Sequence, residues 1–209
     1  MVAVPIFVSI LNAQELKVTQ KEPLEITAKL VLGNNKTKEI VYMKDVVLKH
    51  AGNILKSDKL TILPNNDKII AEDNVSFVNK NNTMEMKGEY VEYFKSNKYV
   101  VMRKSPVLLL TDSEGIKTTV KSDVVELFSE EEKAVVSGNV EMIKEDIKIL
   151  CGQANYDKSL EKIVLEGKPV VFKKQDKYEG DKITIFTKKR NLIADSNVKA
   201  LIYFEEKKQ

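Results

Sequence analysis

The sequence predicts an all-β protein, and three observations carry that prediction. After residue 22, apolar and polar residues alternate at period two in short segments, such as Ile183 and Ile185 before Lys188. The segments end at Asn, Asp, Gly, Ser or Pro, which are turn formers. No stretch of a dozen residues is better explained by the i, i+3, i+4, i+7 spacing of an amphipathic helix. We therefore expect many short strands joined by turns.

The composition excludes several other classes. The 209 residues are 43% hydrophobic, with eight glycines and five prolines. This is too apolar for a disordered chain and too poor in Gly and Pro for a collagen-like one. One cysteine, Cys151, cannot form a disulfide framework. The 34 basic and 31 acidic residues interleave along the chain, so we expect no nucleic-acid partner.

The N-terminus has the character of an export signal. Residues 2–11 form an apolar run with the length of a signal-peptide core, and Ala13 suits the position before a cleavage point. The run is shorter than the roughly 20 apolar residues that a membrane-spanning helix needs. We predict a signal peptide over residues 1–13, although no Lys or Arg precedes Lys17. A first buried strand is the alternative.

A turn pair followed by valine recurs along the chain. The six copies are Lys44-Asp45-Val46, Asp73-Asn74-Val75, Ser105-Pro106-Val107, Gly138-Asn139-Val140, Lys168-Pro169-Val170 and Ser196-Asn197-Val198. Successive valines are separated by 29, 32, 33, 30 and 28 residues. A near-constant period of this length is typical of stacked repeats. We therefore expect one elongated domain over residues 23–204, followed by a charged tail over 205–209.

A second element, a small residue and an acid followed by alternating apolar residues, occurs between these turns. Ser57-Asp58, Gly88-Glu89, Ser122-Asp123 and Gly180-Asp181 begin its four clear copies. Following the alternation from both elements predicts one apolar inner face. The side chains predicted to form an apolar, lipid-binding groove are Leu60, Ile62, Val75, Phe77, Val91, Tyr93, Val107, Leu109, Val125, Leu127, Val140, Met142, Val170, Phe172, Ile183 and Ile185.

These repeats resemble a known family. Gly167-Lys168-Pro169-Val170-Val171-Phe172 and Gly180-Asp181-Lys182-Ile183-Thr184 are similar to the OstA-like repeats of the LptA family of lipopolysaccharide-transport proteins. The resemblance extends from about Pro23 to about Phe204. It implies an elongated open β-jellyroll, folded like a taco shell, that carries the acyl chains of lipopolysaccharide through the periplasm.

The resemblance also implies partners. Its members bridge LptC-like inner-membrane and LptD-like outer-membrane proteins by strand addition, and a head-to-tail homo-oligomer follows the same logic. Unpaired end strands recruit other chains. We expect joining surfaces at the two ends of the domain, formed by Leu24, Ile26, Leu30, Val198, Ala200, Ile202 and Phe204.

Three alternatives remain at this stage. The chain could be an LptC-like membrane-anchored subunit, a cargo-free structural repeat protein, or a β-solenoid enzyme acting on polysaccharide. The repeated acids Asp58, Glu89, Asp123 and Asp181 occupy equivalent positions, where we expect them to accept backbone N–H bonds at strand starts. No phosphate loop, Ser-His-Asp set or metal-ligand spacing occurs. We therefore expect no enzymatic activity, no metal and no cofactor.

Overall fold

The computed structural model describes residues 23–64, 67–188 and 191–203. The predicted signal segment 1–13 and the tail 205–209 lie outside the described residues, as does Phe204. The described residues form eighteen strands and no α-helix, so the all-β prediction is confirmed. In these ranges we find no helix that is long and apolar enough to span a membrane.

The strands follow one another in a single sheet. They are β1 (Glu25–Thr27), β2 (Leu30–Gly33), β3 (Ile40–His50), β4 (Asn53–Ile62), β5 (Lys68–Val78), β6 (Met84–Phe94), β7 (Tyr99–Arg103), β8 (Val107–Thr111), β9 (Lys117–Lys121), β10 (Val124–Phe128), β11 (Lys133–Lys144), β12 (Ile147–Asp157), β13 (Lys162–Glu166), β14 (Val170–Lys173), β15 (Asp176–Glu179), β16 (Lys182–Phe186), β17 (Asn191–Asp195) and β18 (Lys199–Leu201). All pairings are antiparallel.

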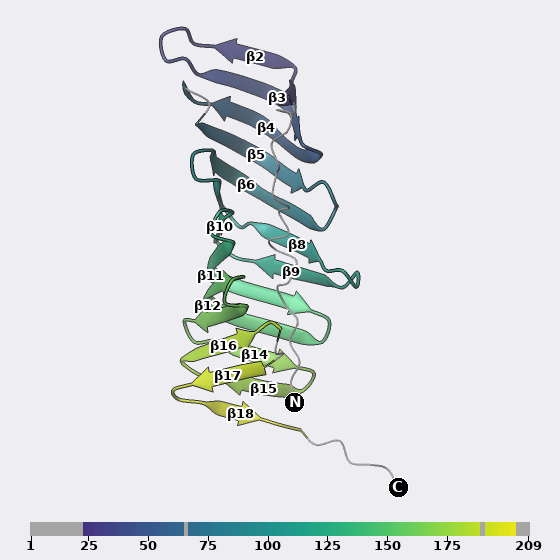
Figure 1. Cartoon of the computed structure of the whole chain (residues 1–209), viewed down its shortest axis with the longest axis vertical. Coiled ribbons are helices and arrows are strands. Elements are labelled where there is room, and N and C mark those ends of the chain that lie inside the picture. The colour runs from purple at the N-terminus through teal and green to yellow at the C-terminus, as the bar shows by residue number, and fades with distance from the viewer. Residues whose placement is uncertain (1–22, 65–66, 189–190, 204–209) are drawn as a thin grey trace.

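Each pass of the chain across the sheet is bent near its middle. In the long strands β3, β4, β5, β6, β11 and β12 the bend is a shift of register or a change of pairing partner. Elsewhere the bend divides a pass into two short strands, as in β7 and β8. The bends align in a line that we call the corner. Figure 1 shows the passes stacked along the long axis, from β2 and β3 to β18.

The corner divides the sheet into two hydrogen-bonded ladders. The first ladder includes β1, β8, β9, β14, β15 and β18, and the second includes β2, β7, β10, β13, β16 and β17. The long strands contribute one half to each ladder. A roughly 30-residue repeat is therefore a hairpin of two bent passes, which explains the period found in the sequence.

Pairs of residues with positive φ make every second bend. They are Lys44-Asp45, Asp73-Asn74, Lys104-Ser105, Gly138-Asn139, Gly167-Lys168 and Ser196-Asn197. The left-handed conformation is uncommon outside Gly, Asn and Asp. Its recurrence in six passes shows that the turn pairs of the sequence are the corner of the fold.

Asp–Asn hydrogen bonds tie together three pairs of neighbouring bends. Asn74 Nδ2 donates to Asp58 Oδ2 at 2.7 Å, and Asn139 Nδ2 donates to Asp123 Oδ2 at 2.9 Å. Asn197 Nδ2 donates to Asp181 Oδ2 at 2.7 Å in the third pair. The expectation that the repeated acids accept backbone N–H groups is wrong for these three contacts, because the facing asparagine side chain supplies the donor. It holds at Glu89, whose Oε2 accepts the Asn74 N–H at 3.4 Å.

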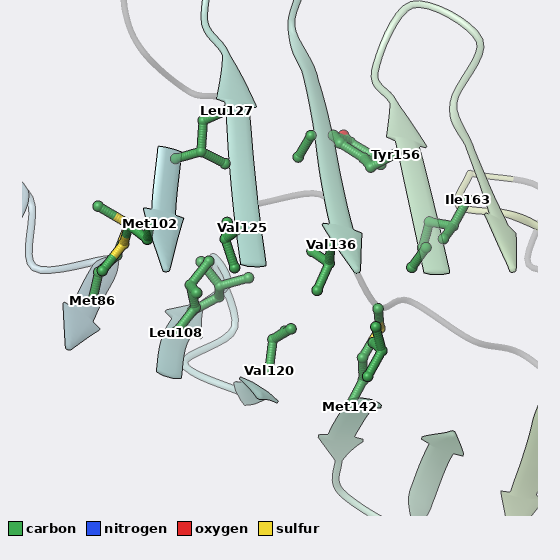
Figure 2. Packing of buried hydrophobic residues seen from close by; sticks show 14 of the residues in the cluster. Met86, Met102, Leu108, Val120, Val125, Leu127, Val136, Met142, Tyr156 and Ile163 are labelled. Atoms are coloured by element: carbon green, nitrogen blue, oxygen red, sulfur yellow. The ribbon is translucent and has the colours of Figure 1, made fainter. Parts of the chain in front are cut away.

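Apolar side chains fill the space between the ladders. Figure 2 shows Val125 and Leu127 of β10 directed toward the side where Leu108 of β8 and Val120 of β9 lie. All four are buried, as are the inward residues of β11 and β12. The core is thus a layer of side chains between the two halves of one folded sheet.

Four predicted inward positions are wrong. Val107, Leu109, Val170 and Phe172 are outside the buried cluster, whereas Leu108, Leu110 and Val171 are inside it. The reason is a one-residue shift in the turn element. Pro106 and Pro169 occupy the first buried position after the positive-φ pair, where other repeats have valine. Because side chains alternate between faces, a shift of one residue reverses the whole strand.

Candidate functional site: the apolar inner face

The inner face is one continuous apolar surface that crosses both ladders. Strand register aligns its side chains in rows that extend from pass to pass. One row of the second ladder joins Ile69, Tyr93, Val100, Leu127 and Ala134, each directly opposite the next. The row continues through Tyr156, Ile163 and Ile185. Such a row presents hydrocarbon from one end of the molecule toward the other.

One inward row of the first ladder changes character along the molecule. Leu48, Leu55 and Phe77 share this row and are only half-buried. The next residues of the row, Met86 and Leu108, are 5% and 2% exposed. Met84 is half-buried in the neighbouring row, one step farther from the corner. The first ladder therefore leaves its inner face accessible over β3 to β5 and at Met84, and closes over it from β8 onward.

The second ladder shows the same change. In the row that includes Ile62, which is buried, Ile69, Tyr93 and Val100 are half-buried, whereas Leu127, Ala134, Tyr156, Ile163 and Ile185 are buried. Tyr42, in the neighbouring row, is also half-buried. We call Tyr42, Ile69, Tyr93 and Val100, together with Leu48, Leu55, Phe77 and Met84, the half-exposed inner face. The buried inward residues of β11, β12, β13 and β16 form the sealed core.

The half-exposed inner face offers almost no polar chemistry. Its members are aliphatic or aromatic, and two tyrosine hydroxyls are its polar atoms. Burial raises the pKa of Tyr93 above its ordinary value, so the hydroxyl stays neutral across the physiological range. Such a surface suits an alkyl chain, because each buried methylene contributes about 0.8 kcal/mol.

The two ends of the sheet carry edge strands. β1 and β2 pair only with β3 among the described strands, and β17 and β18 pair with β16 and β15. Large apolar side chains are exposed at both ends, including Val31 and Leu32 at the first and Ile193 and Ile202 at the last. Unpaired edges with apolar side chains are the features through which sheets add strands.

One hydrogen bond indicates which way the backbone N–H groups point at the C-terminal edge strand, β18. The Tyr203 N–H donates to Asp176 Oδ1 of β15 at 3.0 Å. Because successive N–H groups of a strand point to opposite sides, those of Ala200 and Ile202 point away from β15. The outward donors of the C-terminal edge are therefore at the two positions that the sequence predicted for partner binding.

The predicted site residues fall into clear groups. The structure places on the inner face all the predicted lipid-binding residues except Val107, Leu109, Val170 and Phe172. Of those placed inside, Phe77 and Tyr93 belong to the half-exposed inner face, and the rest are buried: Leu60, Ile62, Val75, Val91, Val125, Leu127, Val140, Met142, Ile183 and Ile185.

Among predicted joining residues, Leu24, Ile26 and Leu30 lie at one end and Val198, Ala200 and Ile202 at the other. Sequence reasoning missed Ile193 of β17, although it follows from the same alternation in the segment Asn191–Asp195. It also left out the half-exposed residues Leu55 and Met84. Their alternation signal was present, but no motif marked them.

The fold and the inner face define a class: an all-β protein whose single sheet bends into two facing ladders around an apolar interior, as in an elongated β-jellyroll. Residues 24–123 match the family model described as OstA-like protein. The match makes this segment, just under half of the chain, OstA-like. No curated protein is significantly similar to the sequence.

A solved structure gives a further comparison. It is LptH, the LptA homologous periplasmic component of the lipopolysaccharide transport device from Pseudomonas aeruginosa. The identity is 13%, the alignment covers 87% of this chain and 96% of that chain, and the TM-score is 0.26. The two whole chains do not superpose closely at this score, so the likeness to OstA-like proteins rests on the match of residues 24–123.

The OstA-like proteins that residues 24–123 match are not enzymes. The repeated acids agree with this assignment, because Asp58, Asp123 and Asp181 are each bonded to an asparagine at the corner and do not converge. In the described ranges, no group of three His, Cys, Asp or Glu side chains is arranged to hold a metal ion.

Proposed function

We propose that this protein carries lipopolysaccharide through the periplasm, shielding its acyl chains against the half-exposed inner face. The observation that supports this most strongly is the contrast within one apolar surface. The half-exposed inner face, on β3 to β7, exposes hydrocarbon that a closed β core would bury, and Leu55, Phe77 and Met84 are among its members. The OstA-like family match agrees with a transport role.

The cargo-free alternative makes a different prediction for the purified protein. A carrier retains lipid through purification, whereas a structural repeat protein does not. We expect mass spectrometry of an organic-solvent extract to detect lipid A-type species from protein expressed in a lipopolysaccharide-producing host. The Phe77→Asp variant places an unpaired carboxylate on the half-exposed inner face, so its extract should lose most of that lipid. Lipid-free wild-type protein would contradict the carrier proposal.

We further propose that the carrier joins LptC-like and LptD-like partners, or further copies of itself, through its end strands. The outward N–H groups of Ala200 and Ile202 support this part of the proposal. Ile202→Pro removes one of those donors without changing the pairing of β18 with β15. We expect sedimentation to show weaker assembly for Ile202→Pro, while Ile202→Ala, which keeps the N–H, assembles more nearly like wild type. Equal assembly of the wild type and Ile202→Pro would contradict edge joining.

A further inference from the structure

Lys144 is the one charged side chain that is buried among the described residues. It lies at the end of β11, on the same face of the strand as Val140 and Met142, and is 3% exposed. Its register partners are Thr118 of β9 and Ile147 of β12, both buried. An ammonium group therefore belongs to the inner face of an otherwise apolar interior.

Lys144 forms an ion pair with Asp112. Its Nζ lies 2.7 Å from Asp112 Oδ2, in the turn between β8 and β9. Asp112 uses its other oxygen for the turn, where Oδ1 accepts the N–H groups of Glu114 and Ile116. Partial burial acts to raise the pKa of Asp112, but the bonds from Lys144 and from Ile116 N–H hold it below its ordinary value. Asp112 is thus a carboxylate at neutral pH.

The pair lies in the same row as the half-exposed Met84, within the sealed part of that row. This row of the first ladder runs from Met84 through Leu110 and Thr118 to Lys144. Met84 is the last half-buried member and Leu110 the first sealed one. Three strand spacings, about 14 Å, separate Met84 from Lys144. A fatty chain spans that distance.

Stability alone is a weak reason for such a pair. Removing a lysine and a carboxylate from water costs free energy that their attraction repays only in part, and apolar replacements are often neutral or stabilising. The exposed ion pair of Lys148 with Glu141 on the next strand shows that the sheet can place lysines outward. A cation on the inner face therefore calls for a role that an apolar residue cannot fill.

We propose that Lys144 binds the phosphate group of an amphiphile whose alkyl chain lies on the half-exposed inner face, and that the phosphate displaces Asp112. This inference rests on the proposed carrier function and names the headgroup chemistry at its site. Phosphate oxygens accept charge-assisted hydrogen bonds from lysine as a carboxylate does. The Asp112 carboxylate then keeps Lys144 paired while the site is empty.

The test compares two amphiphiles with the same alkyl chain. Monododecyl phosphate and dodecyl maltoside, each below its micelle concentration, displace the neutral dye Nile red from the purified protein. We expect Lys144→Met to weaken binding of monododecyl phosphate about tenfold or more, the size of a lost charge-assisted bond. Its affinity for dodecyl maltoside should stay within about twofold of wild type, because the alkyl contacts are unchanged.

Three matched variants separate this role from a structural one. Lys144→Arg should retain preference for the phosphate, and Lys148→Met, which removes an outward lysine, should change neither affinity. Asp112→Asn removes the competing carboxylate, so it should bind monododecyl phosphate more tightly than wild type. A merely structural pair predicts no such gain. Thermal melting of each variant checks that it is folded.

Each outcome is decisive. If folded Lys144→Met binds both amphiphiles as wild type does, the headgroup role is wrong. If inorganic phosphate in excess removes the preference for monododecyl phosphate, the site binds free phosphate and the amphiphile assignment is overturned. If neither amphiphile displaces the dye from wild type, the carrier function itself fails, and the headgroup role with it.

Discussion

The half-exposed inner face and the sealed core are built from the same repeat, yet only one of them excludes water. Leu55 in β4 and Ile149 in β12 lie in one inward row of the first ladder. Ile149 is fully buried and Leu55 is half-buried. The difference arises away from the corner, because Val46 and Leu60 beside the corner are as buried as residues of the sealed core. The repeat thus specifies the bend, and the packing of the rows away from the corner decides whether the interior is open.

The two regions therefore divide stability and binding between them. The sealed core supplies tightly packed side chains, which stabilise the folded sheet. The half-exposed inner face leaves hydrocarbon in contact with solvent, a cost that a bound alkyl chain offsets. The predictions below separate these two roles, beginning with the largest expected effect.

Alanine substitutions at two positions of the same row should separate the two regions most strongly. Ile149→Ala removes a fully buried side chain, and we expect it to lower the free energy of unfolding by about 3 kcal/mol or more. Leu55→Ala should cost about 1 kcal/mol, because water already reaches this side chain. Urea denaturation measures both. Equal losses would mean that the two regions are packed alike.

The glycine bend of the sealed half should be nearly as sensitive. A Cβ at Gly167 would lie 2.8 Å from the Gly152 Cα, and φ at Gly167 is +77°. We expect Gly167→Ala to lower the free energy of unfolding by about 2 kcal/mol through backbone strain and this contact. Gly33→Ala is the control, since a Cβ there meets nothing within 4 Å. A control as destabilised as Gly167→Ala would refute the steric explanation.

The Asp–Asn bonds at the corner should have smaller and similar effects in both regions. Asn74→Ala leaves Asp58 without its donor near the half-exposed inner face, and Asn139→Ala does the same to Asp123 farther along. Each should cost about 1 kcal/mol, the net value of one hydrogen bond, because the bonded residues are exposed. A much larger loss at either position, in thermal or urea unfolding, would show that the corner is not equivalent in the two regions.

Thiol labelling tests accessibility without changing stability greatly. Burial raises the pKa of the Cys151 thiol to about 12, from 9.0. The thiolate is the reactive form, so at pH 8 native Cys151 should react about a thousandfold more slowly than in urea, and its rate should keep rising with pH past 10. A cysteine introduced by Leu55→Cys should label rapidly in the same sample. Rapid native labelling of Cys151 would contradict a sealed core.

Much of this architecture could be predicted from the sequence. Period-two alternation specified the strands, and the turn pairs marked the corner because Asn, Asp and Gly tolerate positive φ. The inward parity failed only where Pro106 and Pro169 replaced valine as the first buried residue. The valines that follow these prolines, Val107 and Val170, were therefore predicted to face inward although they face outward.

The division into an open and a sealed region could not be predicted in this way. Phe77 and Leu127 have the same local pattern, and their burial depends on how far apart the two ladders lie. Lys144 illustrates the same limit. Its place in the alternation predicts an inward side chain, but a lysine near a strand end is usually solvated. The structure shows that Lys144 is buried and that its partner, Asp112, lies 32 residues away in the sequence.

Photo-crosslinking at two matched aromatic positions tests the central claim most directly. Benzoylphenylalanine replaces Phe77 on the half-exposed inner face or Tyr156 in the sealed core, in protein expressed in lipopolysaccharide-producing cells. We predict that irradiation yields a lipopolysaccharide adduct from position 77 and little or none from position 156. Adducts of equal yield at both positions, or an adduct from position 156 alone, would contradict an acyl-chain site confined to the half-exposed inner face.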